Sequence, residues 1–286
     1  METRKIGFIG FGEVGKAFSQ EMKAKGAELY YYDVVNKKHE NWITFLSLPE
    51  LIRGSDIILS TVSTHVAIEV AQESAKHLTS GKIYADMNST SAGVKIKIAE
   101  IIEASTADFI EGAILSAVGE AGPKASILVS GKKGEEFSKL MNQLGLTNVK
   151  YFSAKVGEAS QVKMIRSVFS KGIECLLLEM LISGRRAGVA EYLWKDIIDF
   201  MTKNPFDKVA ENWIRTHATA FERRYHEMVQ VVETLEEIGV EPLMTRGTRD
   251  FFQRSCTLGL EKAFKSKPDS FWDVPDHMER ELKNKP

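Results

Sequence analysis

Several features that mark particular classes of protein are scarce in this 286-residue sequence. There are only two cysteines, Cys175 and Cys256, and their spacing is not that of metal ligands, which excludes a disulfide framework and a cysteine metal site. We expect two reduced, half-buried thiols and no bound metal. Lysine and arginine, 38 together, nearly balance the 39 aspartate and glutamate residues, so nothing indicates a nucleic-acid-binding surface or a charged interaction tail.

Long apolar runs are missing as well. The longest run falls far short of the about 20 residues that a membrane-spanning helix needs. The first predicted strand begins at Ile6, which leaves no room for a signal or transit peptide in front of it. These absences predict a cytoplasmic protein without a membrane partner.

What the sequence does contain is a glycine-rich turn near its start. An apolar run at 6–9 has the length of a buried strand, and it leads into Gly10, Gly12 and Gly15, spaced G-x-G-x-x-G, before a helical pattern at 16–25. Gly10 allows a tight turn, Gly12 lets the backbone approach a pyrophosphate, and Gly15 lets the helix pack closely on the strand. The pattern predicts a dinucleotide site, the alternative being a glycine-rich turn in some other α/β protein.

Asp33 ends the next apolar run, residues 29–32, at the place where a carboxylate accepts hydrogen bonds from ribose hydroxyls. Its charge would repel the 2′-phosphate of NADP, so NAD is the favoured cofactor. NADP is the alternative, with Lys37 and Lys38 as the cations that would reach its phosphate. The predicted cofactor-binding residues are Gly10, Phe11, Gly12, Glu13, Val14, Gly15, Asp33, Thr61, Val62 and Ser63.

Short apolar runs then alternate with helical stretches over the first half of the chain. Such alternation is typical of an α/β fold with a Rossmann-type, doubly wound, mostly parallel sheet that binds its ligands at the carboxyl edge. We therefore predict a dinucleotide-binding domain over residues 1–155. Further strands are predicted at 42–46, 56–60, 82–86, 108–115, 126–129 and 149–152, and helices at 66–77, 92–103 and 135–145, with a short helix beginning at Leu48.

From residue 156 the pattern is helical, which predicts an all-α second domain over 156–286. It begins with an unusually long helix, at about 157–187, that joins the two domains. Four or five more helices are expected between 192 and 264. The tail, residues 265–286, is polar and proline-punctuated, and the sequence leaves open whether it is ordered.

Polar side chains follow two of the predicted strands, where such a sheet binds its ligands. Thr61, Val62 and Ser63 come after the strand at 56–60 and are candidates to line a nicotinamide, the alternative being that they cap the next helix. The block Asp86-Met87-Asn88-Ser89-Thr90-Ser91 ends the next strand and predicts a cradle for a substrate carboxylate. Capping by Thr90 or Ser91 is the alternative here, but it uses only one residue of the block.

Lys163 lies near the start of the long helix, at the junction of the predicted domains, where a cleft is the usual site for a small ligand. Taken alone, a lysine on an amphipathic helix is a solvated surface residue. Arg166, Lys171, Glu174 and Glu179 lie on the same helix, and we expect them to form a solvated or ion-paired face.

Three motifs resemble those of the β-hydroxyacid dehydrogenase superfamily, which includes 3-hydroxyisobutyrate and 6-phosphogluconate dehydrogenases. They are Gly-Phe-Ile-Gly-Phe-Gly-Glu-Val-Gly at 7–15, Asp-Met-Asn-Ser-Thr at 86–90 and Gly-x5-Lys at 157–163, in the right order and at the right distances. The resemblance covers about residues 4–190. It implies a long helix that leads into an all-helical second domain, and a homodimer formed through that domain.

The resemblance also implies roles for single residues. Lys163 falls on the catalytic lysine of the superfamily, and Asn88 and Ser89 fall on its substrate-binding Asn and Ser positions. Thr90, from the same predicted cradle, is a further candidate to bind the substrate. Ser167 stands where the superfamily has a substrate-holding asparagine, and Ser116 matches its Ser-Gly-Gly loop only after a slip of one residue. Residues 115–131 and Lys163-x3-Ser167-x3-Lys171-Gly172 are more similar to a branch called phosphogluconate-dehydrogenase-like, which has its own helical C-terminal domain.

Together these features predict an NAD(P)-dependent oxidoreductase that transfers a hydride between the cofactor and a small β-hydroxy acid or related carbonyl compound, with Lys163 as general acid and base. An imine reductase is one alternative, although those enzymes usually carry Asp or Tyr at the lysine position. A catalytically silent NAD(H)-binding regulatory protein is another, motivated by the altered loop and asparagine. In the helical half, Arg215, Arg223, Arg246 and His217 are candidates to bind a substrate phosphate or carboxylate, surface charge being the alternative for each.

Overall fold

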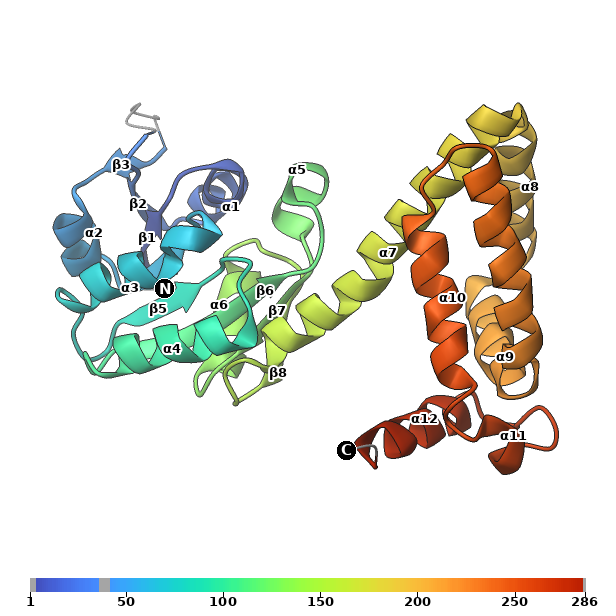
Figure 1. Cartoon of the computed structure of the whole chain (residues 1–286). Helices are drawn as coiled ribbons and strands as arrows, with labels where there is room; N and C mark the ends of the chain where they lie inside the picture. The colour runs from blue at the N-terminus through green and yellow to red at the C-terminus, as the bar shows by residue number, and fades with distance from the viewer. Residues whose placement is uncertain (1–3, 36–41, 285–286) are drawn as a thin grey trace. The chain divides into compact units, whose positions relative to one another are not determined.

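A computed structural model describes residues 4–35 and 42–284 of the chain (Figure 1). Lys37 and Lys38 therefore lie outside the described residues. The chain forms two compact units, Met1–Val168 and Phe169–Pro286. This division falls inside the long helix α7 (Glu158–Ala187), whose first turns are hydrogen-bonded to the first unit.

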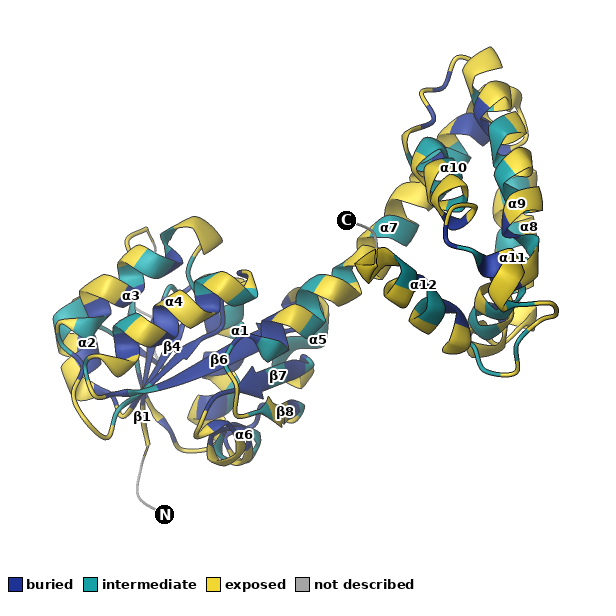
Figure 2. Ribbon diagram, turned by 60° about the horizontal axis from the view of Figure 1, so that its bottom comes forward, coloured by how far each residue is buried: buried dark blue, intermediate teal, exposed yellow. Residues whose placement is uncertain are grey.

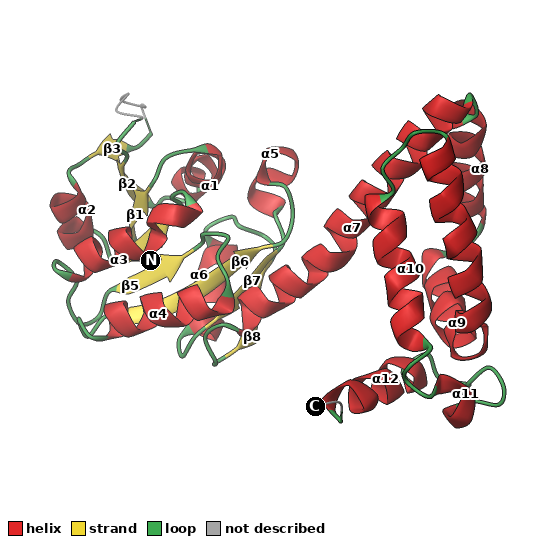
Figure 3. Cartoon of the chain, in the orientation of Figure 1, coloured by secondary structure: helices red, strands yellow, loops and turns green. Residues whose placement is uncertain are grey.

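The first unit contains an eight-stranded sheet in the order β3-β2-β1-β4-β5-β6-β7-β8 (Figure 3). Neighbouring strands are parallel except for β6 and β7, which run antiparallel. The predicted α/β class and mostly parallel sheet are confirmed. The strands are β1 (Lys5–Ile9), β2 (Glu28–Tyr32), β3 (Thr44–Phe45), β4 (Ile57–Ser60), β5 (Ile83–Asp86), β6 (Asp108–Ile114), β7 (Ile127–Ser130) and β8 (Val149–Ser153).

Helices cover both faces of this sheet, and its central strands are buried between them (Figure 2). On one face α1 packs through Phe18 and α6 through Phe137, while α2, α3 and α4 pack on the other through Ile52, Ala71 and Ile98. The helices are α1 (Glu13–Ala24), α2 (Leu48–Gly54), α3 (Ala67–Ala75), α4 (Ala92–Glu103), the short α5 (Val118–Ala121) and α6 (Gly134–Gln143), with 3-10 turns at Thr64–Val66 and Gly122–Lys124.

Polar residues line up across the sheet near the carboxyl ends of its central strands. Ser60 on β4 pairs in register with Asp86 on β5, and Asp86 pairs with Glu111 on β6. Registered neighbours in a parallel sheet point to the same face, so these three side chains share the face that carries α2, α3 and α4. All three are fully buried. This row of polar side chains forms the floor of the site described below.

The second unit is helical and has no strand among its described residues. Its core includes Phe221, Leu258, Leu260 and Val274. The predicted helices between 192 and 264 are confirmed, and the tail contains a further helix whose Pro275 sits in the first turn, where proline is tolerated. After the second part of α7 come α8 (Ala190–Lys203), α9 (Phe206–Glu237), α10 (Leu243–Ser255), α11 (Leu260–Ala263) and α12 (Asp273–Lys283).

Both cysteines are exposed, so the prediction of half-buried thiols is wrong. Cys175 lies on a solvent-facing side of α7, and Cys256 follows the last residue of α10. Helical periodicity alone did not reveal which side of each helix packs on the rest of the unit. Across the described part of the chain, no helix is both long and apolar enough to pass through a membrane.

Glu179 on α7 is not a solvated surface residue, contrary to prediction. Its carboxylate accepts hydrogen bonds from the backbone N–H groups of Met244 and Thr245, each at 2.8 Å, and from the Thr245 hydroxyl at 2.6 Å. It thereby caps the N-terminus of α10 from a neighbouring helix. Lys171 and Glu174 form the expected exposed ion pair, at 3.1 Å.

The cap makes the stability of the helical unit depend on pH. Partial burial raises the pKa of Glu179, but the hydrogen bonds from Thr245 and the α10 backbone outweigh it and leave the pKa below its usual value of 4.5. Because the folded-state pKa is lowered, the stabilisation is present above pH 4.5 and is lost as the pH falls. We expect Glu179→Gln to lower the free energy of unfolding by about 1–2 kcal/mol at pH 7.

Urea unfolding at pH 7 and at pH 4 measures this effect. The difference in the free energy of unfolding between wild type and Glu179→Gln should be smaller at pH 4 than at pH 7. The exposed control Glu174→Gln should have a free energy of unfolding close to that of wild type at both pH values. If Glu179→Gln lowered the free energy of unfolding equally at both pH values, the charge of Glu179 would not stabilise α10.

Candidate active site

The glycine turn between β1 and α1 has the geometry that its sequence predicts. Gly10 adopts a φ of +86°, and a Cβ there would lie 2.6 Å from the Thr61 carbonyl oxygen. A Cβ on Gly15 would lie 3.0 Å from the Gly10 carbonyl oxygen, which is closer than most Cβ contacts in proteins. A Cβ on Gly12 would meet no atom within 4 Å, and Gly12 caps α1 without a side chain. The backbone at Gly12 is therefore open to the close approach of a phosphate at the N-terminus of α1.

Thr61, at the end of β4, supports this turn. Its hydroxyl donates a hydrogen bond to the Gly10 carbonyl at 2.7 Å, and its N–H bonds to the Ile9 carbonyl at 2.8 Å. Ser63 takes the N-cap position of the following 3-10 turn, but its exposed side chain forms no capping hydrogen bond. The hydroxyl of Thr61 thus holds the glycine turn and caps no helix.

Asp33 is held beside the same turn. One carboxylate oxygen accepts a hydrogen bond from the Phe11 N–H at 2.7 Å, and the other accepts one from the Val35 N–H at 2.7 Å. The ring of Phe11 is buried and packs on Tyr31 with centroids 4.4 Å apart. Only the backbone of Phe11 is therefore available at the surface of the turn. The paired N–H groups orient the Asp33 carboxylate at the end of β2, where the nucleotide ribose is predicted to lie.

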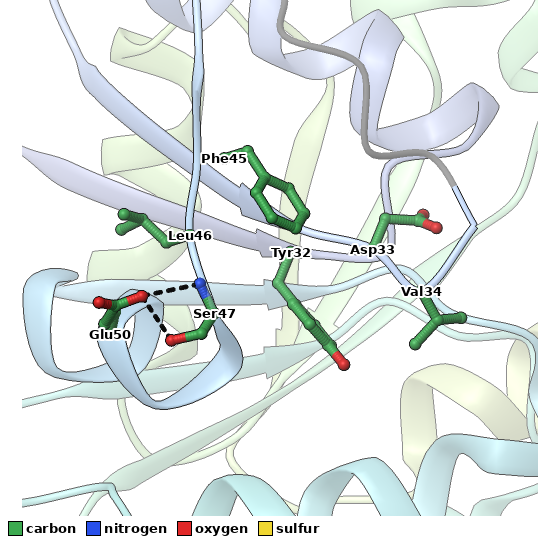
Figure 4. A pocket seen from close by; sticks show the side chains of 7 residues that line it. All are labelled: Tyr32, Asp33, Val34, Phe45, Leu46, Ser47 and Glu50. Carbon is green, nitrogen blue, oxygen red and sulfur yellow. Dashed lines mark hydrogen bonds between the residues drawn. The ribbon is translucent and has the colours of Figure 1, made fainter.

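A pocket of about 430 Å³ opens next to Asp33 (Figure 4). Tyr32 and Phe45 contribute rings to it, and Ser47 and Glu50 close its far side by bonding to each other, with Ser47 N to Glu50 at 3.0 Å. Flat apolar walls with a carboxylate at one edge fit a nucleoside, with the base against the rings and the ribose at Asp33. The lining residues are Tyr32, Asp33, Val34, Phe45, Leu46, Ser47 and Glu50.

A fully buried ion pair lies under the block that follows β5. Lys95 Nζ on α4 contacts an Asp86 carboxylate oxygen at 2.6 Å, and it also donates to the carbonyls of Asp86 and Gly112, at 2.8 and 3.2 Å. The same Asp86 oxygen accepts the Asn88 N–H at 2.9 Å. Lys95 thus fixes the turn that presents Asn88. The sequence did not reveal it, because a lysine on an amphipathic helix ordinarily faces solvent.

The block itself divides into a cap and a buried polar pair. Ser91 caps α4 by accepting the Val94 N–H at 3.5 Å, and Ser89 is exposed. Asn88 donates from its side-chain amide to the Ser60 hydroxyl at 3.1 Å. Its amide oxygen and the Thr90 hydroxyl are buried and have no hydrogen-bond partner within the described residues. Buried polar atoms need partners, so this pair fits a bound polar ligand.

Glu111 anchors the long helix to the sheet. Its carboxylate, fully buried on β6, accepts the N–H groups of Gly157 at 2.6 Å and Ser160 at 2.7 Å. These are N–H groups at the N-terminus of α7, where a negative charge is favoured by the helix dipole. An acid inside the otherwise apolar strand 109–114 was the sequence signal for this residue, and it was missed.

Lys163 lies on the anchored part of α7. It is half-buried, and its ammonium has no hydrogen-bonding or ion-pairing partner among the described residues. Burial, and then the positive charge of Lys95, lower the pKa of Lys163 below its usual value of 10.5. Ser167 donates its hydroxyl to the Lys163 carbonyl at 3.0 Å, so its side chain is bonded to its own helix. A half-buried ammonium with a lowered pKa and no partner among the described residues makes Lys163 a candidate for proton transfer.

Two further residues act on the loop after β6. Ser116 accepts the Ser126 N–H at 2.8 Å, so its hydroxyl oxygen closes this loop. Arg166 is exposed, as predicted for a solvated face of the helix, and it donates to the Leu115 carbonyl at 2.7 Å, which holds the loop against α7. The structure therefore connects the glycine turn, β4, the Asn88 block and the start of α7 through short contacts within the first unit.

The basic candidates of the helical unit have other contacts. Arg223 and Arg246 form exposed ion pairs with Glu227 and Glu236, and Arg215 donates to the Pro268 carbonyl at 2.7 Å. His217 is buried against aromatic rings and does not contribute surface charge. No three His, Cys, Asp or Glu side chains gather as metal ligands within residues 4–35 and 42–284.

Known protein families match both units. Residues 5–151 match the NAD binding domain of 6-phosphogluconate dehydrogenase, and residues 185–255 match a domain of unknown function (DUF1932). The "Uncharacterized 28.5 kDa protein in 7S RNA 5'region" of Methanothermus fervidus is 28% identical over 255 residues, 87% of this chain and 98% of that protein. The 2-(hydroxymethyl)glutarate dehydrogenase of Eubacterium barkeri is 19% identical over 285 residues, 94% and 95% of the two chains.

Solved structures show the same fold. A conserved protein of unknown function, described as structurally similar to 3-hydroxyacid dehydrogenases, is 28% identical with a TM-score of 0.58, over 87% of this chain and 96% of that one. A reductive aminase from Aspergillus terreus, in complex with NADPH and ethyl-5-oxohexanoate, is 16% identical with a TM-score of 0.74, over 90% and 95%. At that identity the likeness concerns the fold alone.

The family match covers just over half of the chain and includes the glycine turn, Asp33 and the Asn88 block. The chain therefore belongs to the family whose nucleotide-binding domain is that of 6-phosphogluconate dehydrogenase, within the β-hydroxyacid dehydrogenase superfamily.

Proposed function

We propose that the chain is an NAD(H)-dependent oxidoreductase that interconverts a small β-hydroxy acid and the corresponding carbonyl compound. The observation that carries this proposal is the half-buried Lys163, whose pKa is lowered, on a helix that Glu111 ties to the nucleotide-binding sheet. The name of the 2-(hydroxymethyl)glutarate dehydrogenase relative supports a hydroxy acid as the substrate class.

Different residues of the chain would bind the cofactor, orient the substrate and transfer the proton. The glycine turn would hold the pyrophosphate, and Asp33 the ribose; when bound, the cofactor supplies or accepts the hydride. Lys163 in its neutral form takes the hydroxyl proton during oxidation, and as the ammonium it returns that proton during reduction. Asn88 and Thr90 would orient the polar groups of the substrate, with their unpaired buried oxygens as the contact points.

The second candidate function is imine reduction. Its support is the fold of the Aspergillus terreus reductive aminase, and of a Streptomyces aurantiacus imine reductase with a TM-score of 0.75 at 15% identity. Lys163 weighs against it, because the resemblance implies an Asp or Tyr at this position in an imine reductase. The third candidate, an NAD(H)-binding regulator, needs the cofactor site but not Lys163.

The carboxylate of Asp33 predicts which nicotinamide cofactor the protein binds. At one hundred times its dissociation constant a ligand adds about 2.7 kcal/mol to stability, and each kcal/mol raises the melting midpoint by about 2–4 °C in a protein of this size. We expect NADH to raise the midpoint and NADPH at the same concentration to raise it much less, because Asp33 repels a 2′-phosphate.

Gly12→Val provides the matched control for this thermal-shift comparison. The glycine has an ordinary φ of −82° and open space around it, so the variant should fold normally and lose the NADH shift. An NADPH-selective shift would contradict the role given to Asp33, and no shift with either nucleotide would contradict the oxidoreductase.

The proposed role of Lys163 in proton transfer predicts the kinetics of a variant that lacks its ammonium. With NAD and either 2-(hydroxymethyl)glutarate or 3-hydroxyisobutyrate, Lys163→Met should bind NADH like wild type but lose at least about a hundredfold in kcat, the usual scale for a general acid or base. Lys171→Met, an exposed lysine on the same helix, should keep wild-type kinetics. Tight NADH binding without turnover of hydroxy acids or imines in the wild type would favour the regulatory protein.

The same role predicts how kcat depends on pH. The lowered pKa of Lys163 means that its neutral form accumulates at a lower pH than in a free lysine. The kcat for oxidation should therefore rise with pH and level off with a midpoint below 10.5, while kcat for reduction should fall as the pH rises and the ammonium is lost. Initial rates between pH 6 and pH 11 test both curves, and a midpoint that Lys163→Met leaves in place would assign the titration to another group.

A further inference from the structure

The helical unit contains a second concave site, separate in sequence from every residue discussed for the nucleotide. The α9, α10 and α12 helices enclose a cavity of about 760 Å³, which lies within the range of small-molecule sites. Its walls are apolar and aromatic, with Trp213 and Met228 from α9, Phe251 from α10 and Met278 from α12. All of its lining residues belong to the compact unit Phe169–Pro286.

Arg224 brings the one formal charge among the lining residues of this cavity. Its guanidinium donates to the Thr216 hydroxyl at 2.8 Å and to the Trp213 carbonyl at 3.3 Å, both neutral acceptors. No described carboxylate lies within ion-pair distance of it, and nearby Glu227 is paired with Arg223. A partly desolvated cation without a counter-ion is costly, and an anion in the cavity would remove that cost.

His217 adds no charge beside Arg224. Its ring stacks on Phe252 with centroids 5.4 Å apart, and its Nε2 lies 3.0 Å from the Ser255 hydroxyl. That hydroxyl donates to the Phe251 carbonyl at 3.0 Å, so its oxygen accepts the Nε2–H of the neutral imidazole. Burial, and then the charge of Arg224, lower the pKa of His217 to about 4. At neutral pH the cavity therefore carries a single positive charge at one side of an apolar volume.

We propose that this cavity binds a small organic anion: an apolar, ring-sized body against Trp213 and Phe251, with its carboxylate on Arg224. The planar guanidinium can meet a carboxylate through two parallel N–H groups, a geometry that an ammonium does not offer. The site includes α9 and α10, which lie largely within the region matched by the domain of unknown function. It does not depend on the function proposed for the first unit.

Isothermal titration of the full-length chain with 2-naphthoate, and with the uncharged 2-naphthalenemethanol, tests the site. Wild type should bind the carboxylate at least tenfold more tightly than the alcohol. Arg224→Gln should weaken 2-naphthoate binding at least tenfold and leave the alcohol unchanged, and the ion-paired surface variant Arg223→Gln should match wild type. Equal affinity for the two compounds, or an unaffected Arg224→Gln variant, would overturn the proposal.

A second variant locates binding in the cavity itself. Thr248 lines the cavity from α10 and is partly exposed, so Thr248→Trp should fill the volume without removing a core side chain and should abolish binding of both compounds. Retained binding in this variant would place the ligand elsewhere. Failure of wild type to bind either compound, together with a dimer in sedimentation that Thr248→Trp dissociates, would show that a second copy of the chain covers the cavity instead.

Discussion

The buried carboxylate of Glu111 is the contact on which the geometry of the candidate active site depends. A carboxylate removed from water is tolerated only when its oxygens are hydrogen-bonded, and here the partners are N–H groups of Gly157 and Ser160. N–H groups at a helix N-terminus have no hydrogen-bond partner within the helix, so the carboxylate and these N–H groups satisfy each other. The bond joins β6 to α7, and α7 carries Lys163. The lysine is consequently placed by a strand in the middle of the sheet.

The buried pair of Lys95 and Asp86 has a related effect on the neighbouring strand. Lys95 uses its ammonium on three oxygen atoms, two from Asp86 and one from Gly112, so the charge is compensated where it is buried. The cation also acts on Lys163 from a distance, since like charges disfavour a second ammonium. One residue thus fixes the Asn88 turn and, by lowering the pKa of Lys163, favours the neutral form of that lysine.

Features determined by local sequence were predicted, and features that need distant partners were not. The glycine turn, the alternation of strands and helices and the helical second half follow from spacing and periodicity over short windows, and the structure confirms them. Glu111 lies 46 residues before Gly157, and Glu179 lies 66 residues before Thr245, so no local pattern reveals either cap. The exposure of Cys256 and the tie between Arg166 and Leu115 depend in the same way on packing. The roles of Ser167 and Ser116 were inferred from resemblance, and their side chains are bonded within the protein.

The position of the unit boundary inside α7 bears on how such a protein can be divided or recombined. Domains that are joined by a loop can be separated or exchanged by a cut in that loop, with little loss of structure. Here a cut at Val168 would fall in the middle of a 30-residue helix and break its i to i−4 hydrogen bonds on both sides. It would also leave Lys163 on a frayed end of fewer than four turns. A sequence that replaces the helical unit therefore has to continue the same helix without a break across the junction.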